Sequence, residues 1–176
     1  MEEPSNPPPA SPAPTALPLP EGRLTGRVAF IDAVRQVASA SASQGWSRIL
    51  LSDPDFADWP LGERSVIEAL NAWARRGRQL RLLARDFSAL RTLHPRFTAW
   101  RTTWSHLIEA HAVPQASPHE LPGVIWTADW TLERLDPVRC SLVASRAPER
   151  RVALHERLDE WWMKGRPAFA PTTLGL

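Results

Sequence analysis

With 176 residues, 21 of them basic and 19 acidic, the chain carries a formal net charge of +2. This length suits one domain with a tail and allows a core to be buried without crosslinks. A charge balance so close to neutral excludes the usual electrostatic nucleic-acid-binding protein, which has a clear basic excess.

The first 22 residues are rich in proline, alanine and serine. Proline lacks a backbone donor and the segment has few apolar side chains to bury, so we predict a disordered tail over residues 1–22. A polyproline ligand for an aromatic-lined groove is the alternative interpretation of this segment. The domain itself is expected over residues 23–169, followed by a second tail at 170–176.

Apolar periodicity predicts alternating helices and strands through the domain. Helices are expected at 30–44, 62–77, 95–108 and 147–165. Strands are expected at 46–51, 80–84, 109–113, 124–135 and 140–144, the last two forming a hairpin around Asp136 and Pro137.

This order of elements predicts the fold class. Strands that are separated by helices pair in parallel through right-handed crossovers, and the two C-terminal strands add an antiparallel edge. We therefore expect a single α/β domain with a mixed, mostly parallel sheet, helices on both faces, a C-terminal antiparallel hairpin and a closing helix.

The chain has one cysteine, Cys140, which excludes an intrachain disulfide and is typical of a reducing compartment. No apolar run approaches the roughly 20 residues of a membrane span, and the N-terminal residues lack the features of a secretory signal. We expect a cytoplasmic protein with no membrane span. The five histidines match no zinc-ligand spacing, so neither a metal nor a cofactor is expected.

Charged side chains follow three of the predicted strands. In an open α/β sheet, ligands bind beyond the carboxyl ends of the strands, and this rule selects Asp53, Arg85, Asp86 and His111 as a candidate ligand-binding cluster. The alternative is structural, because aspartates such as Asp53 and Asp86 commonly accept hydrogen bonds from loop backbone donors, and Arg85 can pair with either.

Three consecutive segments carry a family resemblance. Ser-Asp-Pro-Asp ends a strand at 52–55, a helix ends in Ala-Trp-Ala-Arg-Arg-Gly at 72–77, and Gln-Leu-Arg-Leu-Leu-Ala-Arg-Asp follows at 79–86. With the order of the elements, this pattern resembles the half-domain of phospholipase-D-like proteins over about residues 28–162.

The resemblance implies a His-x-Lys-x(4)-Asp motif on the next strand, with the histidine as phosphoryl-accepting nucleophile and the lysine holding the phosphoryl oxygens. If Asp129 takes the aspartate position, Pro122 and Val124 stand at the histidine and lysine positions. His119 lies three residues before that register. The resemblance therefore implies a degenerate bacterial member of the family, with no catalytic residue.

Our leading hypothesis is a non-catalytic binding or scaffolding domain with an unidentified protein partner. If copies pair as the family resemblance implies, a homodimer is expected, with Trp126 and Trp130 as candidate interface residues.

Two other functions stay open. One is an enzyme acting on phosphate esters, with His111 as base or nucleophile, Arg85 as anion clamp and Asp86 orienting the imidazole. The other is weak nucleic-acid binding through the arginines at 75, 76, 78 and 81, although these also follow a helix C-terminus, where cations are favoured by the helix dipole. Nucleic acid is the less expected partner because of the near-neutral charge.

Overall fold

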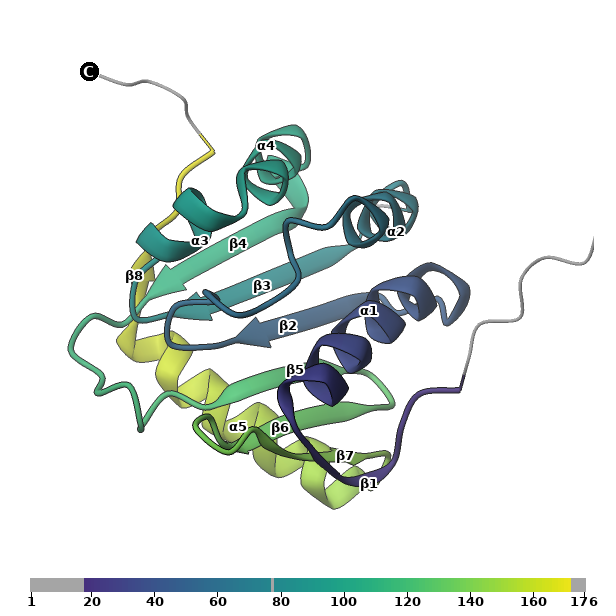
Figure 1. Ribbon diagram of the computed structural model, residues 1–176. Helices are drawn as coiled ribbons and strands as arrows, with labels where there is room; N and C mark the ends of the chain where they lie inside the picture. Colours follow the sequence, from purple (N-terminus) through teal and green to yellow (C-terminus); the bar gives the residue numbers. More distant parts are fainter. Residues whose placement is uncertain (1–17, 77, 172–176) are drawn as a thin grey trace, which may run out of the picture.

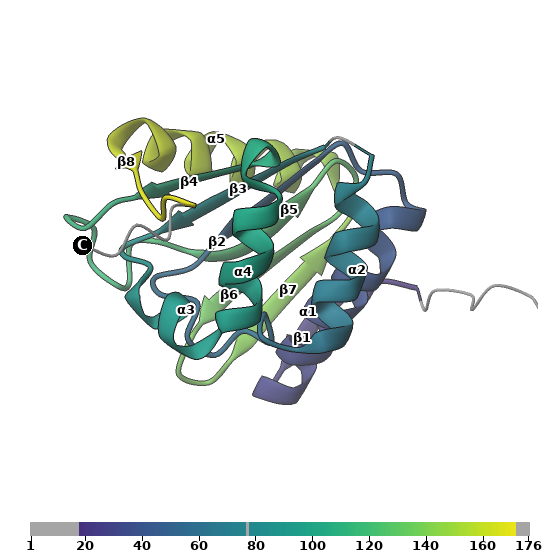
Figure 2. The same cartoon turned by 90° about the horizontal axis from the view of Figure 1, so that it is seen from above.

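A computed structural model describes residues 18–76 and 78–171. It contains one eight-stranded sheet, with helices α1 to α4 on one face and α5 on the other (Figures 1 and 2). The strands are β1 (Gly22–Thr25), β2 (Arg48–Ser52), β3 (Gln79–Ala84), β4 (Ile108–Ala112), β5 (Gly123–Thr127), β6 (Thr131–Asp136), β7 (Ser141–Ser145) and β8 (Arg166–Pro167). The helices are α1 (Arg27–Ser43), α2 (Arg64–Ala74), α3 (Ser88–Leu93), α4 (Pro95–Thr103) and α5 (Pro148–Lys164), with a short 3-10 turn at Ser105–Leu107.

The strand order is β1-β7-β6-β5-β2-β3-β4-β8. This arrangement confirms the predicted α/β fold with a mixed sheet, a C-terminal antiparallel hairpin (β6–β7) and a closing helix (α5). Parallel pairs are fewer than expected. The pairs β2–β3 and β3–β4 are parallel, whereas β5 runs antiparallel to β2. The physical reason is the connection from β4 to β5. This loop contains no helix that would return the chain to the amino ends of the parallel strands, so β5 starts at the end where β4 stops and runs in the opposite direction.

The predicted strand 124–135 is two strands, β5 and β6, joined by a tight turn. The N–H of Thr127 donates to the carbonyl of Trp130 at 2.9 Å, and the N–H of Trp130 donates to Oγ1 of Thr127 at 3.1 Å. The alternation of apolar and polar residues continues through this turn, so the sequence pattern concealed it. The predicted helix 95–108 is shorter, and the chain enters β4 at Ile108.

One apolar layer lies on each face of the sheet. Alternate residues of one strand point to opposite faces, so Ile49 and Leu51 of β2 join the large core under α1 to α4, whereas Leu50 joins a smaller cluster under α5. Helix α5 contributes Leu154 and Leu158 to this second cluster, and both side chains are buried. The helix thus covers the face opposite the other four helices.

The packed region begins before Arg23, at the end of the proline-rich segment. Leu19 is buried, and the carbonyl of Pro20 accepts a hydrogen bond from Nε1 of Trp130 at 2.9 Å. At the other end, Oγ1 of Thr102 donates to the carbonyl of Pro171 at 3.2 Å. The prediction of disorder falls mostly on residues 1–17, which lie outside the described residues. No helix within the described ranges has both the length and the apolar character that crossing a bilayer requires.

Candidate functional site

A cavity of about 310 Å³ opens where β2 and β6 end and β5 begins, at the edge of the sheet where the sequence predicted ligand binding. We call it the sheet-end pocket. Its walls include Pro54, His119, Pro122, Gly123, Arg134 and Arg157. The loop that connects β4 to β5 forms one side of the pocket, and α5 contributes Arg157.

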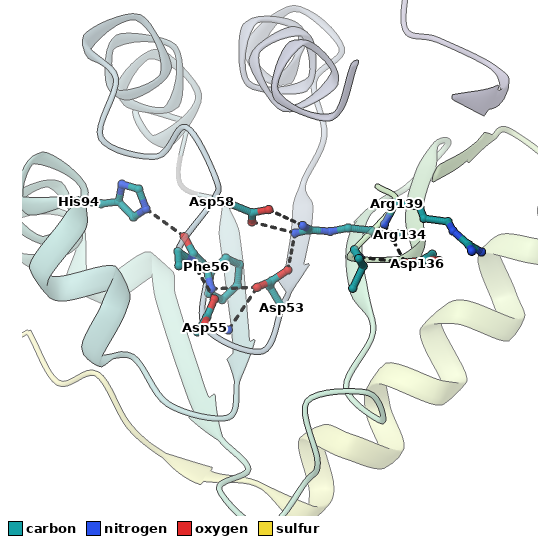
Figure 3. A network of polar contacts seen from close by, with 10 residues as sticks. Asp53, Asp55, Phe56, Asp58, His94, Arg134, Asp136 and Arg139 are labelled. Atoms are coloured by element: carbon teal, nitrogen blue, oxygen red, sulfur yellow. Dashed lines mark hydrogen bonds and ion pairs between the residues drawn. The ribbon is translucent and has the colours of Figure 1, made fainter. Parts of the chain in front are cut away.

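A buried group of charges lies behind this pocket. Arg134 Nη2 donates to Asp53 Oδ2 at 2.7 Å and Nη1 donates to Asp58 Oδ2 at 2.6 Å (Figure 3). The side chains of Arg134 and Asp53 are each only 5% exposed. Burial raises the pKa of the Asp53 carboxyl, and the charge of Arg134 opposes this shift only in part. The pair joins two segments that are 81 residues apart in sequence.

Asp53 also shapes the loop that follows β2. Its Oδ1 accepts the backbone N–H groups of Asp55 at 3.2 Å and Phe56 at 2.9 Å. Phe56 has a positive φ of 59° and is fully buried. Its carbonyl accepts a hydrogen bond from Nε2 of the buried His94 at 2.9 Å (Figure 3). These contacts hold a strained loop in place, which is the structural role that the sequence left open for Asp53.

The other face of β6 carries a second ion-pair group. Glu133 is 8% exposed and accepts hydrogen bonds from Arg150 and Arg157, both on α5. Successive residues of a strand point to opposite faces, so Glu133 meets α5 and Arg134 meets the α1 side. Both arginines that line the sheet-end pocket, Arg134 and Arg157, therefore have carboxylate partners within the chain.

The positions that the family resemblance assigns to histidine and lysine hold Pro122 and Val124. Pro122 lines the pocket, and Val124 is 1% exposed inside the apolar cluster under α5. Asp129 lies beyond the other end of β5, where it accepts a hydrogen bond from Nε1 of Trp46 at 2.7 Å and pairs with Arg146. His119 is the histidine on the pocket wall, and it is exposed.

Gly123 marks a close approach that sequence reasoning missed. A Cβ atom at this position would lie 3.2 Å from Oδ2 of Asp53 and 3.2 Å from Nε of Arg134. The glycine at the start of β5 thus leaves room for the buried ion pair. A glycine inside an apolar strand pattern is the sequence signal for such an approach.

The four predicted ligand-binding residues do not all lie in one pocket. Arg85 Nε donates to the carbonyl of Ala116 at 2.7 Å, and Asp86 Oδ1 accepts the N–H of Ser88 at 2.9 Å. His111 is stacked on Trp162, with ring centroids 3.9 Å apart.

Among the described residues, no hydrogen bond or ion pair joins any two of Asp53, Arg85, Asp86 and His111. Arg85 and Asp86 do line one recess together, whereas His111 lines another. The separation follows from strand alternation, which directs Asp53 to the α1 side and His111 to α5.

The two candidate interface tryptophans are not free. Trp130 is fully buried within this chain, where its indole packs in the core. Trp126 is half-buried, and its Nε1 donates to the carbonyl of Arg151 on α5 at 2.9 Å. Both indoles stabilise the domain itself. Within residues 18–76 and 78–171, no group of three or more histidine, cysteine, aspartate or glutamate side chains is placed to hold a metal ion.

No protein-family model matches the sequence, and no curated protein matches it either. Solved structures do. TrmBL2, an archaeal chromatin protein whose structure shows a novel mode of DNA binding, superposes with a TM-score of 0.57 at 16% identity, covering 83% of this chain and 52% of that one. Nuc from Salmonella typhimurium, a phospholipase D family member, superposes with a TM-score of 0.52 at 13% identity, covering 76% of this chain and 90% of that one.

The chain has a phospholipase-D-like fold. This confirms the fold that the resemblance implied. Because the sequence identities are only 16% and 13%, the similarity concerns the arrangement of helices and strands. It does not indicate an activity for this chain. The chain also spans only about half the length of the chromatin protein.

Proposed function

We propose that this chain is a non-catalytic binding domain on a phospholipase-D-like fold. The observation that carries the proposal is what stands at the motif positions that the resemblance assigns. Pro122, at the histidine position, lines the sheet-end pocket, and Val124, at the lysine position, is buried in the apolar cluster under α5. Proline offers no nucleophile, and valine offers no charge to a phosphoryl oxygen.

The charges of the pocket support the same proposal. Catalysis of phosphoryl transfer needs cations aimed at the oxygens where negative charge develops. Arg134 is held by Asp53 and Asp58, and Arg157 is held by Glu133. A phosphate ester in this pocket would have to compete with carboxylates for both guanidinium groups.

A phosphoester-acting enzyme is the alternative from a different class. Its histidine would be His119 on the pocket wall or His111 at β4. His111 Nδ1 is hydrogen-bonded to the carbonyl of Trp162 at 3.0 Å, and one face of its ring is covered by that indole. These contacts favour a packing role for His111 over a catalytic one.

Hydrolysis of bis(4-nitrophenyl) phosphate by the full chain tests the proposal. We expect release of nitrophenolate at the rate of buffer alone, unchanged in His119→Ala and His111→Ala. A rate well above buffer that is lost in either variant would establish catalysis and would identify the histidine responsible.

Weak nucleic-acid binding is a second candidate, favoured by the likeness to a DNA-binding chromatin protein. Arg75 and Arg76 are exposed after α2. Arg81, however, pairs with Glu109 and lies near Asp159, which reduces the charge that this group offers to phosphates. We therefore rank this candidate below a binding domain for a smaller ligand or a protein.

A further inference from the structure

A second recess opens at the carboxyl ends of β3 and β4, between α3 and the segment that follows α5. Its volume is about 210 Å³. We call it the arginine recess because Arg85, Arg91 and Arg166 line it, together with Asp86 and Phe169. It shares no lining residue with the sheet-end pocket.

The arginines of this recess differ from those of the sheet-end pocket in their partners. Among the described residues, none of Arg85, Arg91 and Arg166 takes part in an ion pair. Arg85 is half-buried, and its Nε is fixed by the carbonyl of Ala116 at 2.7 Å, which leaves its two terminal nitrogens for another acceptor. Arg91 lies over the ring of Phe169, 5.2 Å from the centroid. The side chains that line the recess thus carry three positive charges.

The negative charge on the wall of the recess comes from Asp86. Its Oδ1 already accepts the N–H of Ser88 at 2.9 Å, a contact that holds the start of α3. The recess therefore keeps a net positive charge in a protein that is otherwise close to neutral. Such a local excess attracts an anion without requiring a basic chain overall.

A fourth arginine lies near the same aromatic ring, although it does not line the recess. Arg101 is 5% exposed, its guanidinium lies 5.8 Å from the Phe169 centroid, and its Nε and Nη1 have no hydrogen-bond partner among the described residues. A buried charge without a partner is costly, and an anion bound nearby offsets part of that cost. The Phe169 ring thus lies near guanidinium groups from both α3 and α4.

We propose that the arginine recess binds a terminal phosphate group, as carried by a phosphomonoester. Guanidinium groups form short, paired hydrogen bonds with phosphate oxygens, and the carboxyl ends of parallel strands are where open α/β sheets bind ligands. Three guanidinium groups match the double charge of a monoester better than the single charge of a diester. The inference holds whether or not the sheet-end pocket is catalytic, so it goes beyond the proposed function.

Isothermal titration of the full chain with phenyl phosphate tests this site, with diphenyl phosphate as the matched diester. We expect saturable binding of the monoester and at least about tenfold weaker binding of the diester. Arg85→Gln and Arg166→Gln should each raise the Kd about tenfold, the loss of one charge-assisted contact. Arg48→Gln, at an exposed arginine that begins β2 and so lies at the amino ends of the parallel strands, should leave the Kd unchanged.

A substitution that removes the negative charge of the recess should have the opposite effect on binding. Asp86→Asn keeps an oxygen for the Ser88 N–H and removes the negative charge, so the Kd for phenyl phosphate should fall severalfold. Thermal unfolding midpoints of all variants, measured without ligand, show that each is folded.

Three results would overturn the proposal. The first is no saturable binding of phenyl phosphate, and the second is binding that Arg85→Gln and Arg166→Gln leave unchanged. The third result concerns titrations with hexathymidylate. The proposal predicts that a strand with a 5′-phosphate binds more tightly than a strand with a 5′-hydroxyl. Equal binding of the two strands would mean that the surface contacts phosphodiesters, as a nucleic-acid-binding protein does.

Discussion

At the scale of single residues, the ion pair of Asp53 and Arg134 is the most consequential contact of the fold. Both side chains are 5% exposed. The charge of Asp53 is compensated by Arg134, and the charge of Arg134 is compensated by Asp53 and Asp58. Removing one partner of a buried pair leaves an isolated buried charge, and such changes destabilise proteins by about 3–5 kcal/mol. The pair ties the loop after β2 to β6, which also forms one wall of the sheet-end pocket.

Arg134→Met should therefore lower the free energy of unfolding in urea by about 3–5 kcal/mol at pH 7.5, followed by tryptophan fluorescence. Burial already raises the pKa of Asp53, so without Arg134 the folded state binds a proton more readily than the unfolded state. The loss of unfolding free energy should then be full at pH values above the pKa of Asp53 in the folded variant. It should shrink as the pH falls through that pKa. Arg64→Met, whose side chain is 84% exposed, serves as control with a change below about 1 kcal/mol. A loss of that small size for Arg134→Met would show that the pair is not buried as described.

At the scale of elements, α5 covers the second apolar layer. Leu154 and Leu158 are its buried residues, and Glu133 of β6 anchors it through Arg150 and Arg157, two helical turns apart. The ion pairs are partly exposed, at 33% for Arg150 and 45% for Arg157, so solvent screening reduces what they contribute. Apolar packing is therefore the main contribution to the attachment of the helix.

Leu158→Ala should destabilise the protein by about 2–5 kcal/mol, because the side chain is fully buried and its removal leaves a cavity between α5 and the sheet. Val152→Ala on the same helix should change stability by less than about 0.5 kcal/mol, since Val152 is 54% exposed. Urea unfolding of the two variants checks this contrast. Equal effects would mean that α5 does not pack on the sheet through the Leu158 face.

At the scale of the whole molecule, the boundary of the folded unit depends on a contact between distant segments. Leu19 and Pro20 belong to the proline-rich segment, yet Leu19 is buried and Pro20 provides the acceptor for Nε1 of Trp130. A chain that starts at residue 23 loses an apolar side chain from the core and leaves a buried indole N–H without its acceptor. Each of these losses costs on the order of 1–3 kcal/mol.

A chain that starts at residue 18 should thus have a free energy of unfolding in urea about 2–6 kcal/mol higher than a chain that starts at residue 23. The full chain is the reference for both. If the two shortened chains are equally stable, the segment 18–22 contributes nothing to the fold.

Much of the architecture was predictable from the sequence, because local apolar periodicity records which face of a segment is buried. The pattern predicted a helix at 147–165, and α5 spans Pro148–Lys164; it also predicted strands near β2, β3 and β4. For the candidate site, the sequence predicted only that it lies at the carboxyl ends of the parallel strands. Arg85 and Asp86 do share a recess there, whereas Asp53 pairs with Arg134, a residue that no local pattern selected.

The sequence by itself determined the class of fold and the alternation of helices and strands from β2 to β4 and at α5. Only the tertiary structure decided that β5 lies antiparallel beside β2, that Trp130 is covered by the N-terminal segment, and which arginines have carboxylate partners. The physical reason is that periodicity arises within a few residues, whereas these contacts join segments up to 110 residues apart. Their formation depends on how the packed layers close over one another.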